Sequence, residues 1–201
     1  METRSNFQQA EAIIRQKGGI LRTSEALRLG IHPRTLYRMH EMGRLERLER
    51  GLYRLPETPP FTHPDFVIVA RKVPRGVICL TSALAFHGLT TQVPHAVHLA
   101  LPTGARRPRL HYPPLRVYRF SLPTFEAGIE IHEDGGVPFR LYNPAKSVAD
   151  AFKFRRRIGT DIAIEALRNY LRSGRPLDAL MDYARLCRVA GVIRPYVEAL
   201  T

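Results

Sequence analysis

The sequence predicts an α+β protein in two parts, and three observations support this prediction. Four prolines in LPETPPFTHP, at 55–64, prevent a continuous helix or central strand there. The residues before this segment have the spacing of short helices followed by a hairpin, whereas those after it indicate a helix, then short strands, then helices. We therefore expect a folded domain at 1–56, a Pro-rich linker at 57–64 and a second, α+β domain at 65–201.

The first domain begins with two short helices. Phe7, Ala10 and Ile14 lie on one face of a predicted amphipathic helix at 5–17, which the following pair of glycines ends. A second helix of about two turns begins at Thr23 or Ser24, because either side chain can cap free backbone N–H groups. These helices are expected to support the segment that follows.

The second and third helices have the spacing of a helix-turn-helix. Gly30 can adopt the positive φ of a tight turn, and Pro33 opens the third helix, HPRTLYRMHEMG. The small Ala26 permits close approach of the two helices, and their predicted joint core consists of Leu29, Ile31, Leu36 and Met39. The outer face of the third helix, which in this motif enters the major groove of DNA, consists of Arg34, Thr35, Tyr37 and Arg38. The alternative is an ordinary helical hairpin with a solvated basic face.

A short hairpin after the third helix favours the DNA-binding alternative. Residues 45–48 and 52–55 form two strand-like segments joined across Arg50 and Gly51, which predicts a wing and hence a winged helix-turn-helix. Arg47, Arg50 and Arg54 would then lie along a minor groove or the phosphate backbone. Alternatively, the hairpin only covers the helical core.

Charge and composition point to the same class of partner. The chain has 201 residues, 44% of them hydrophobic, and a formal net charge of +13, which favours double-stranded DNA or another polyanion. An anionic membrane is the second candidate, but no apolar run approaches the length of a spanning helix and METRSNFQQA has no apolar signal region. We expect a cytoplasmic protein in which Cys79 and Cys187 are buried free thiols.

The second domain is predicted to contain strands followed by helices. The candidate strands are 97–101, 115–120, 128–132 and 139–142, and the candidate helices are 144–154, 161–171 and 177–189. A possible second basic surface near one strand connection consists of Arg106, Arg107, Arg109, Arg116 and Arg119. This surface could follow the DNA backbone, hold a partner protein or remain solvated.

No catalytic or metal-binding motif is apparent. The acidic residues Glu126, Glu130, Glu133 and Asp134 lack a lysine at the spacing that a metal-dependent nuclease requires. His95 and His98 follow Pro94 at a strand entry, where they are expected to point to opposite faces and not to chelate a metal. We expect no enzymatic activity, no cofactor and no metal.

Four ordered segments resemble one protein family. LGIHPRTLYRMHEMGRLERLERGLYRLPE, ICLTSALAFHGL at 78–89, VHLALPTGARRPR at 97–109 and YNPAKSVADAFKFR at 142–155 are similar to the AbiEi family of antitoxins and transcriptional regulators. The resemblance implies a C-terminal α+β antitoxin domain and repression of the protein's own operon through inverted repeats. It also implies a nucleotidyltransferase-like toxin as partner in a type IV toxin-antitoxin, or abortive-infection, system. The alternative is an orphan regulator or a protein-interaction module without a toxin, since no motif identifies the toxin.

Overall fold

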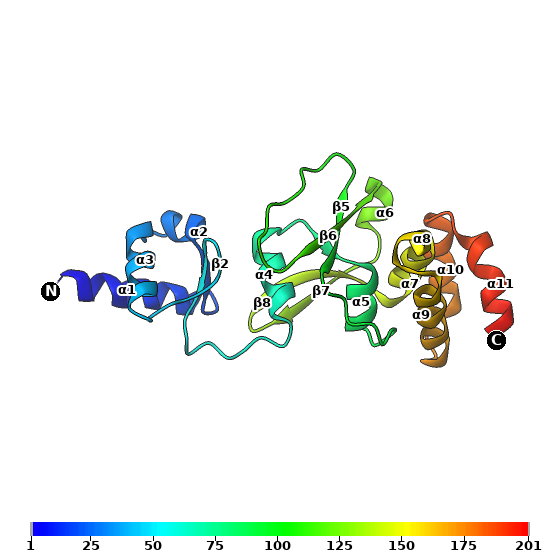
Figure 1. The fold of residues 1–201 in the computed structure, drawn as a ribbon, viewed down its shortest axis with the longest axis horizontal. Coiled ribbons are helices and arrows are strands. Elements are labelled where there is room, and N and C mark those ends of the chain that lie inside the picture. The colour runs from blue at the N-terminus through cyan, green and yellow to red at the C-terminus, as the bar shows by residue number, and fades with distance from the viewer. Residues whose placement is uncertain (1, 201) are drawn as a thin grey trace. The chain divides into compact units, whose positions relative to one another are not determined.

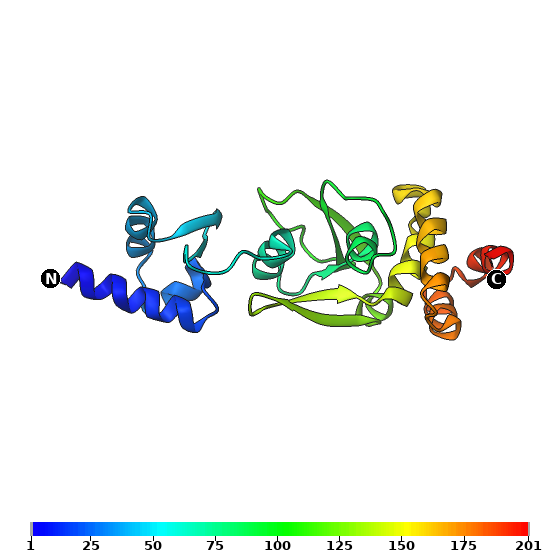
Figure 2. The same cartoon turned by 90° about the horizontal axis from the view of Figure 1, so that it is seen from below.

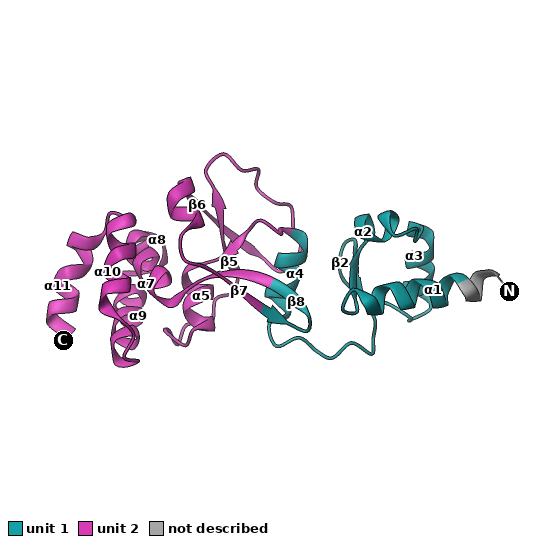
Figure 3. Cartoon of the chain, turned by 180° about the vertical axis from the view of Figure 1, so that it is seen from behind, with its two compact units in different colours: residues 1–72, 133–138 teal, residues 73–132, 139–201 magenta. Residues whose placement is uncertain are grey.

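The computed structural model describes residues 2–200, with side chains from residue 6 onward, and has the predicted α+β class. The chain divides into two compact units (Figure 3). The first unit extends to residue 72 and includes 133–138, and the second contains 73–132 and the residues from 139 onward. Residues 57–63 contain no helix or strand.

The first unit has the element order of a winged helix-turn-helix, followed by one further helix (Figure 1). Its elements are α1 (Glu2–Gln16), β1 (Ile20–Arg22), α2 (Thr23–Arg28), α3 (Pro33–Glu41), β2 (Glu46–Glu49), β3 (Leu52–Arg54) and α4 (Pro64–Lys72). The three strands form an antiparallel sheet in the order β1-β3-β2. The wing predicted from the sequence is therefore the β2–β3 hairpin.

The core of this unit follows the predicted helical phase with one exception. Ala26, Leu36 and Met39 are fully buried and Ile31 is nearly so, but Leu29 is 39% exposed, so the prediction that it belongs to the core is wrong. The reason is local, since α2 ends at Arg28 and the Ile31 N–H donates to the Ala26 carbonyl. This bond directs the side chain of residue 31 inward and leaves that of residue 29 at the surface.

Helix α2 begins at Thr23, as predicted, but its first turn is not capped in the predicted way. No side chain caps its free backbone N–H groups, because the helix already includes Thr23 and Ser24. Instead, the Glu25 carboxylate accepts a hydrogen bond from the Arg22 backbone N–H, at 3.0 Å. The Thr23 N–H donates to the Gly51 carbonyl at the tip of the wing, so the turn of the wing is fixed against the start of α2.

The second unit combines a mixed sheet with a helical bundle (Figure 2). Its elements are β4 (Val77–Ile78), α5 (Leu80–Phe86), β5 (Val97–Pro102), β6 (Leu115–Phe120), α6 (Leu122–Glu126), β7 (Ile129–Asp134), β8 (Val137–Tyr142), α7 (Pro144–Lys153), α8 (Arg155–Ile158), α9 (Thr160–Arg172), α10 (Leu177–Leu186) and α11 (Ala190–Leu200), except that the end of β7 and the start of β8, within 133–138, belong to the first unit. The strand order is β6-β5-β4-β8-β7, in which β4 is antiparallel to β5 and parallel to β8, and β5 is parallel to β6. The helices from α7 onward pack together at one end of this sheet.

All four predicted strands and the first two predicted helices of this region are present. The predicted helix at 177–189 is present as α10, but it ends earlier, at Leu186, and Arg188 has a φ of +59°. That left-handed residue separates α10 from α11, which was not predicted. Both cysteines are free and buried, and no helix within residues 2–200 is long and apolar enough to cross a membrane.

His95 and His98 do not point to opposite faces of a strand, as the sequence analysis expected. His98 is buried on β5, whereas His95 is exposed in the loop before this strand, and both line one cavity. The prediction that they point to opposite faces is wrong because the strand begins only at Val97. Within residues 2–200, no group of three His, Cys, Asp or Glu side chains is arranged to hold a metal.

Candidate nucleic-acid interface

Helix α3 is anchored by its inner face and by its first turn. Leu36 and Met39 are fully buried, and Pro33 occupies the start of the helix, where a missing N–H costs nothing. The His32 Nδ1 accepts a hydrogen bond from the Arg34 backbone N–H, at 3.2 Å. The helix is therefore held in one rotational position, which determines the side chains that it presents to solvent.

The outer face of α3 carries two arginines that have no acidic partner. Arg34, Tyr37 and Arg38 are exposed, and Thr35 is half-buried beside them. Arg34 and Arg38 are four residues apart and therefore neighbours on the helix surface, and neither makes an ion pair with a residue whose side chain the structure describes. Two like charges at this spacing repel, at a cost of a few tenths of a kcal/mol. An anion bound between them would reverse that cost.

A contact that the sequence analysis missed joins the end of α3 to the wing. The His40 Nδ1 is 3.0 Å from the Leu45 carbonyl oxygen, and its ring lies edge-on to that of Tyr53 with centroids 6.0 Å apart. Tyr53 is buried on β3, and burial raises the pKa of its hydroxyl, an effect that the nearby charge of Arg47 opposes. Hydrophobic spacing gives no signal for His40 because its side chain is exposed.

The tip of the wing presents a second pair of basic side chains. Arg47 lies at a register irregularity of β2, and Arg50 occupies the turn with Gly51, whose φ is +72°. Both arginines are exposed and neither makes an ion pair within the part of the chain whose side chains are described. Arg54 is different, because its Nε donates to the Glu46 carboxylate at 2.6 Å and its guanidinium lies 6.0 Å from the Phe61 ring centroid. Arg54 is thus engaged inside the unit.

Several other basic residues of the first unit form internal ion pairs. These pairs are Arg15 with Glu57 (2.7 Å), Arg44 with Glu11 (2.9 Å), Arg71 with Glu25 (3.8 Å) and Lys72 with Glu49 (2.6 Å). The pairs connect α1, α2, the wing and α4. The basic side chains of α3 and the wing tip therefore differ from these in lacking an acidic partner among the described side chains.

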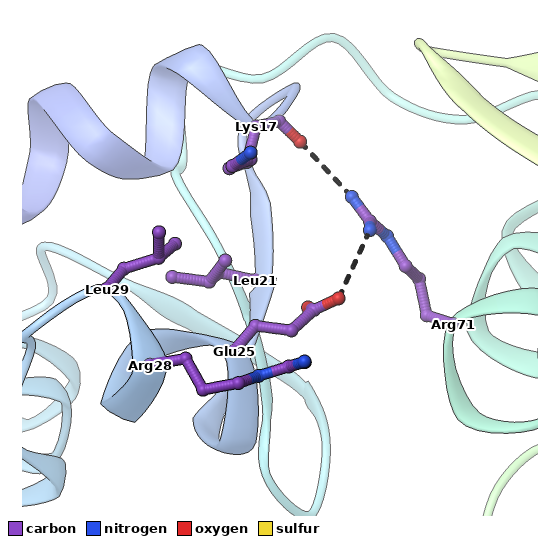
Figure 4. A pocket seen from close by; sticks show the side chains of 6 residues that line it. All are labelled: Lys17, Leu21, Glu25, Arg28, Leu29 and Arg71. Carbon is purple, nitrogen blue, oxygen red and sulfur yellow. Dashed lines mark hydrogen bonds and ion pairs between the residues drawn. The ribbon is translucent and has the colours of Figure 1, made fainter.

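Arg71 of α4 binds the start of the helix-turn-helix through several contacts. Its Nη2 donates to the backbone carbonyls of Lys17 and Ile20, at 3.1 and 3.2 Å, and Figure 4 shows the side chain between Lys17 and Glu25. Arg71, Lys17 and Glu25, together with Leu21, Arg28 and Leu29, line a cavity of about 380 Å³. These contacts fix α4 to α2 and β1 within the first unit.

The possible second basic surface does not lie on a single face. Arg106, Arg107 and Arg109 are exposed in the connection between β5 and β6. Arg116 and Arg119 are also exposed on β6, but they are three residues apart on a strand and so point to opposite faces of the sheet. The structure therefore groups the three arginines of the connection and separates the two on the strand.

Comparison with known proteins gives a family for the N-terminal region and a similar fold for most of the chain. Residues 8–56 match a family model described as "Transcriptional regulator, AbiEi antitoxin", which confirms the resemblance for these residues. The solved structure of the RV2827C protein from Mycobacterium tuberculosis is similar over 90% of this chain and 75% of that chain, with a TM-score of 0.53 and 16% identity. At this identity the likeness concerns the fold alone. No curated protein matches the chain.

Proposed function

We propose that this chain, whose residues 8–56 match the AbiEi family of antitoxin transcriptional regulators, is a repressor that reads an operator with α3 and the wing tip. The observation that carries the proposal is the distribution of charge in the first unit. Arg34, Arg38, Arg47 and Arg50 are exposed without an acidic partner among the described side chains, as are Lys17 and Arg28, whereas Arg15, Arg44, Arg54, Arg71 and Lys72 of this unit form ion pairs. Phosphates or base edges would supply the missing partners.

The outer face of α3 and the wing tip have distinct roles in this proposal. The outer face of α3 enters the major groove, where Arg34 and Arg38 donate to guanine O6 and N7, and Tyr37 and Thr35 contact phosphates or a thymine methyl group. The wing tip follows the adjacent backbone or minor groove. Autoregulation through inverted repeats would present two equivalent half-sites to two copies of the chain. None of these roles involves catalysis.

DNA titration tests the recognition helix. The full chain is titrated with the DNA upstream of its own gene and with a scrambled duplex, at one salt concentration. We expect Arg34→Ala and Arg38→Ala each to lose about 1 to 3 kcal/mol of specific binding. The matched control is Arg172→Ala/Arg194→Ala, which removes two exposed arginines from the second unit. Unaltered operator affinity in both α3 variants would contradict the assignment.

The second function we propose is that of an antitoxin in a type IV system, with the C-terminal region counteracting a nucleotidyltransferase-like toxin. It is supported by the family description of residues 8–56 and by the exposed arginines of the β5–β6 connection. Charge reversal of Arg106, Arg107 and Arg109 should abolish rescue of growth from a co-encoded toxin while operator binding persists, because like-charge contacts at an interface cost several kcal/mol. Full rescue by the reversed protein would leave an orphan regulator or another interaction module as the better description.

A further inference from the structure

The second unit contains a cavity of about 290 Å³ that the proposed function does not use. It is lined by the loop at 92–96, by the beginnings of β5, β6, α5 and α9, and by the end of α8. Its wall combines polar side chains, among them Thr81, His98 and Arg116, with the apolar side chains of Val93, Ile158 and Ile162. No acidic residue of the described chain lines it.

The strand register brings two of the polar side chains together. His98 on β5 and Arg116 on β6 are partners in the parallel ladder, and partners in a ladder project from the same face of a sheet. Arg119, three residues further along β6, lies on the other face and donates from Nη1 to the Pro102 carbonyl, at 3.3 Å. The cavity therefore receives one guanidinium from this strand.

His98 is fixed in place, but its ring is not fully satisfied. Its backbone N–H donates to the Ser82 Oγ at 2.9 Å, and its ring centroid lies 5.2 Å from that of Tyr118. The residue is only 5% exposed, yet its Nδ1 has no hydrogen-bond partner among the described residues. A buried polar atom without a partner destabilises the fold. This nitrogen is itself buried, so a ligand in the cavity would lie beside the ring without reaching this atom.

The electrostatic surroundings favour an anion. Burial and, to a smaller extent, the charges of Arg116 and Arg157 together lower the pKa of His98 to about 4. The ring is therefore neutral at neutral pH and can donate one N–H. The Arg157 guanidinium lies 4.3 Å from the Tyr118 ring centroid. The guanidinium groups of Arg116 and Arg157 therefore both add positive charge near His98.

We propose that this cavity binds a small organic monocarboxylate. The carboxylate pairs with the Arg116 guanidinium beside the neutral His98 ring, while the apolar body of the ligand contacts Val93, Ile158 and Ile162. A guanidinium matches the two oxygens of a carboxylate. Inorganic phosphate has no apolar part to bury against the other wall of the cavity.

Methyl NMR of the full chain tests the proposal, with benzoate as the probe and benzamide and inorganic phosphate as comparison compounds. We expect benzoate to shift the Ile158 and Ile162 methyl resonances saturably, with a Kd in the millimolar range or below, as suits a ligand of this size. Benzamide has the same shape without the charge, so it should bind at least about tenfold more weakly, which is the scale of a charge-assisted hydrogen bond.

Two variants on one strand complete the test. Arg116→Gln should reduce benzoate affinity at least about tenfold, because it removes the paired charge. Arg119→Gln is the matched control on the opposite face of β6 and should leave the affinity unchanged. Absence of saturable shifts, equal binding of benzamide, or equal affinity in Arg116→Gln would overturn the proposal. Phosphate shifting the same methyl groups as strongly as benzoate would overturn the carboxylate assignment.

Discussion

The Lys72 Nζ lies 2.6 Å from the Glu49 Oε2, and this ion pair joins the last residue of α4 to the last residue of β2 in the wing. The Glu49 side chain is only 4% exposed. Lys72 also donates to the Arg50 carbonyl in the turn of the wing. The wing is therefore stabilised by a helix that lies beyond the Pro-rich segment in the sequence.

Lys72→Met should destabilise the first unit by about 1 to 3 kcal/mol, because it removes the cation from a nearly buried carboxylate. Urea unfolding of the full chain measures this loss. The double variant Lys72→Met/Glu49→Gln should recover part of the stability, since it also removes the buried charge. If Lys72→Met unfolds at the wild-type urea concentration, α4 contributes nothing to the wing.

Under the proposed function, Arg47 and Arg50 are expected to contact phosphates, and Arg34 and Arg38 are expected to contact base edges. Removing a phosphate contact weakens binding to all sequences alike and lowers the slope of log K against log salt by roughly 0.9 for each contact. We therefore expect Arg47→Ala/Arg50→Ala to reduce this slope while keeping the ratio of operator to scrambled-DNA affinity. An unchanged slope, measured across a salt series, would mean that the wing tip does not touch the backbone.

The first unit could be predicted from local spacing because its core positions are close in sequence. Ile31, Leu36 and Met39 lie in the predicted phase, and the turn at Gly51 joins the two wing strands. The role of Lys72 could not be predicted, since its ion pair joins residues that no periodicity relates. The same limit applies to the candidate site, where spacing predicts which arginines face outward but not that Arg54 is held by Glu46.

In the second unit, three features of the structure could not be predicted from the sequence pattern. The separation of α10 from α11 depends on the left-handed conformation of Arg188. A glycine at this position would have indicated a turn, whereas an arginine does not. Strand β4 has only two residues, so it is too short to show alternation. Lys146 and Asp150 have the i, i+4 spacing of an ordinary surface pair, yet both are fully buried.

The Lys146–Asp150 pair gives a further prediction. The Lys146 Nζ is 2.5 Å from the Asp150 Oδ2 and 4.1 Å from the Tyr142 ring centroid, and the Cys187 thiol donates to the other carboxylate oxygen. Burial raises the pKa of Asp150, and the charge of Lys146 opposes that rise. Lys146→Met should therefore cost about 3 to 5 kcal/mol of unfolding free energy, because a buried carboxyl loses its cation.

A double-mutant cycle checks this interaction. Lys146→Met/Asp150→Asn should be more stable than the sum of the single losses predicts, by about 1 to 3 kcal/mol, because neither buried charge is left alone. The measurement is urea unfolding of the four proteins at one pH. Strictly additive losses would show that the two side chains do not interact energetically.

Buried His98 should make the stability of the second unit sensitive to acid. Its pKa is lowered to about 4 in the folded protein, first by burial and then by Arg116 and Arg157, whereas an unfolded chain has the ordinary value of 6.5. Because the folded pKa is the lower one, the stabilising contribution is fully present above pH 6.5 and is lost as the pH falls from 6.5 towards 4. Between pH 7 and pH 5 the loss amounts to about 2 kcal/mol.

The matched variant is His98→Phe, which keeps an aromatic ring beside Tyr118 but cannot take up a proton. Urea unfolding at both pH values should show that the wild-type protein loses about 2 kcal/mol more than the variant on acidification. Groups common to both proteins, such as His87, whose pKa burial also lowers, cancel in this difference. Equal losses in the two proteins would mean that His98 takes up its proton as readily in the folded state as in the unfolded chain. The proposed carboxylate site would then lose its support from a neutral His98 ring.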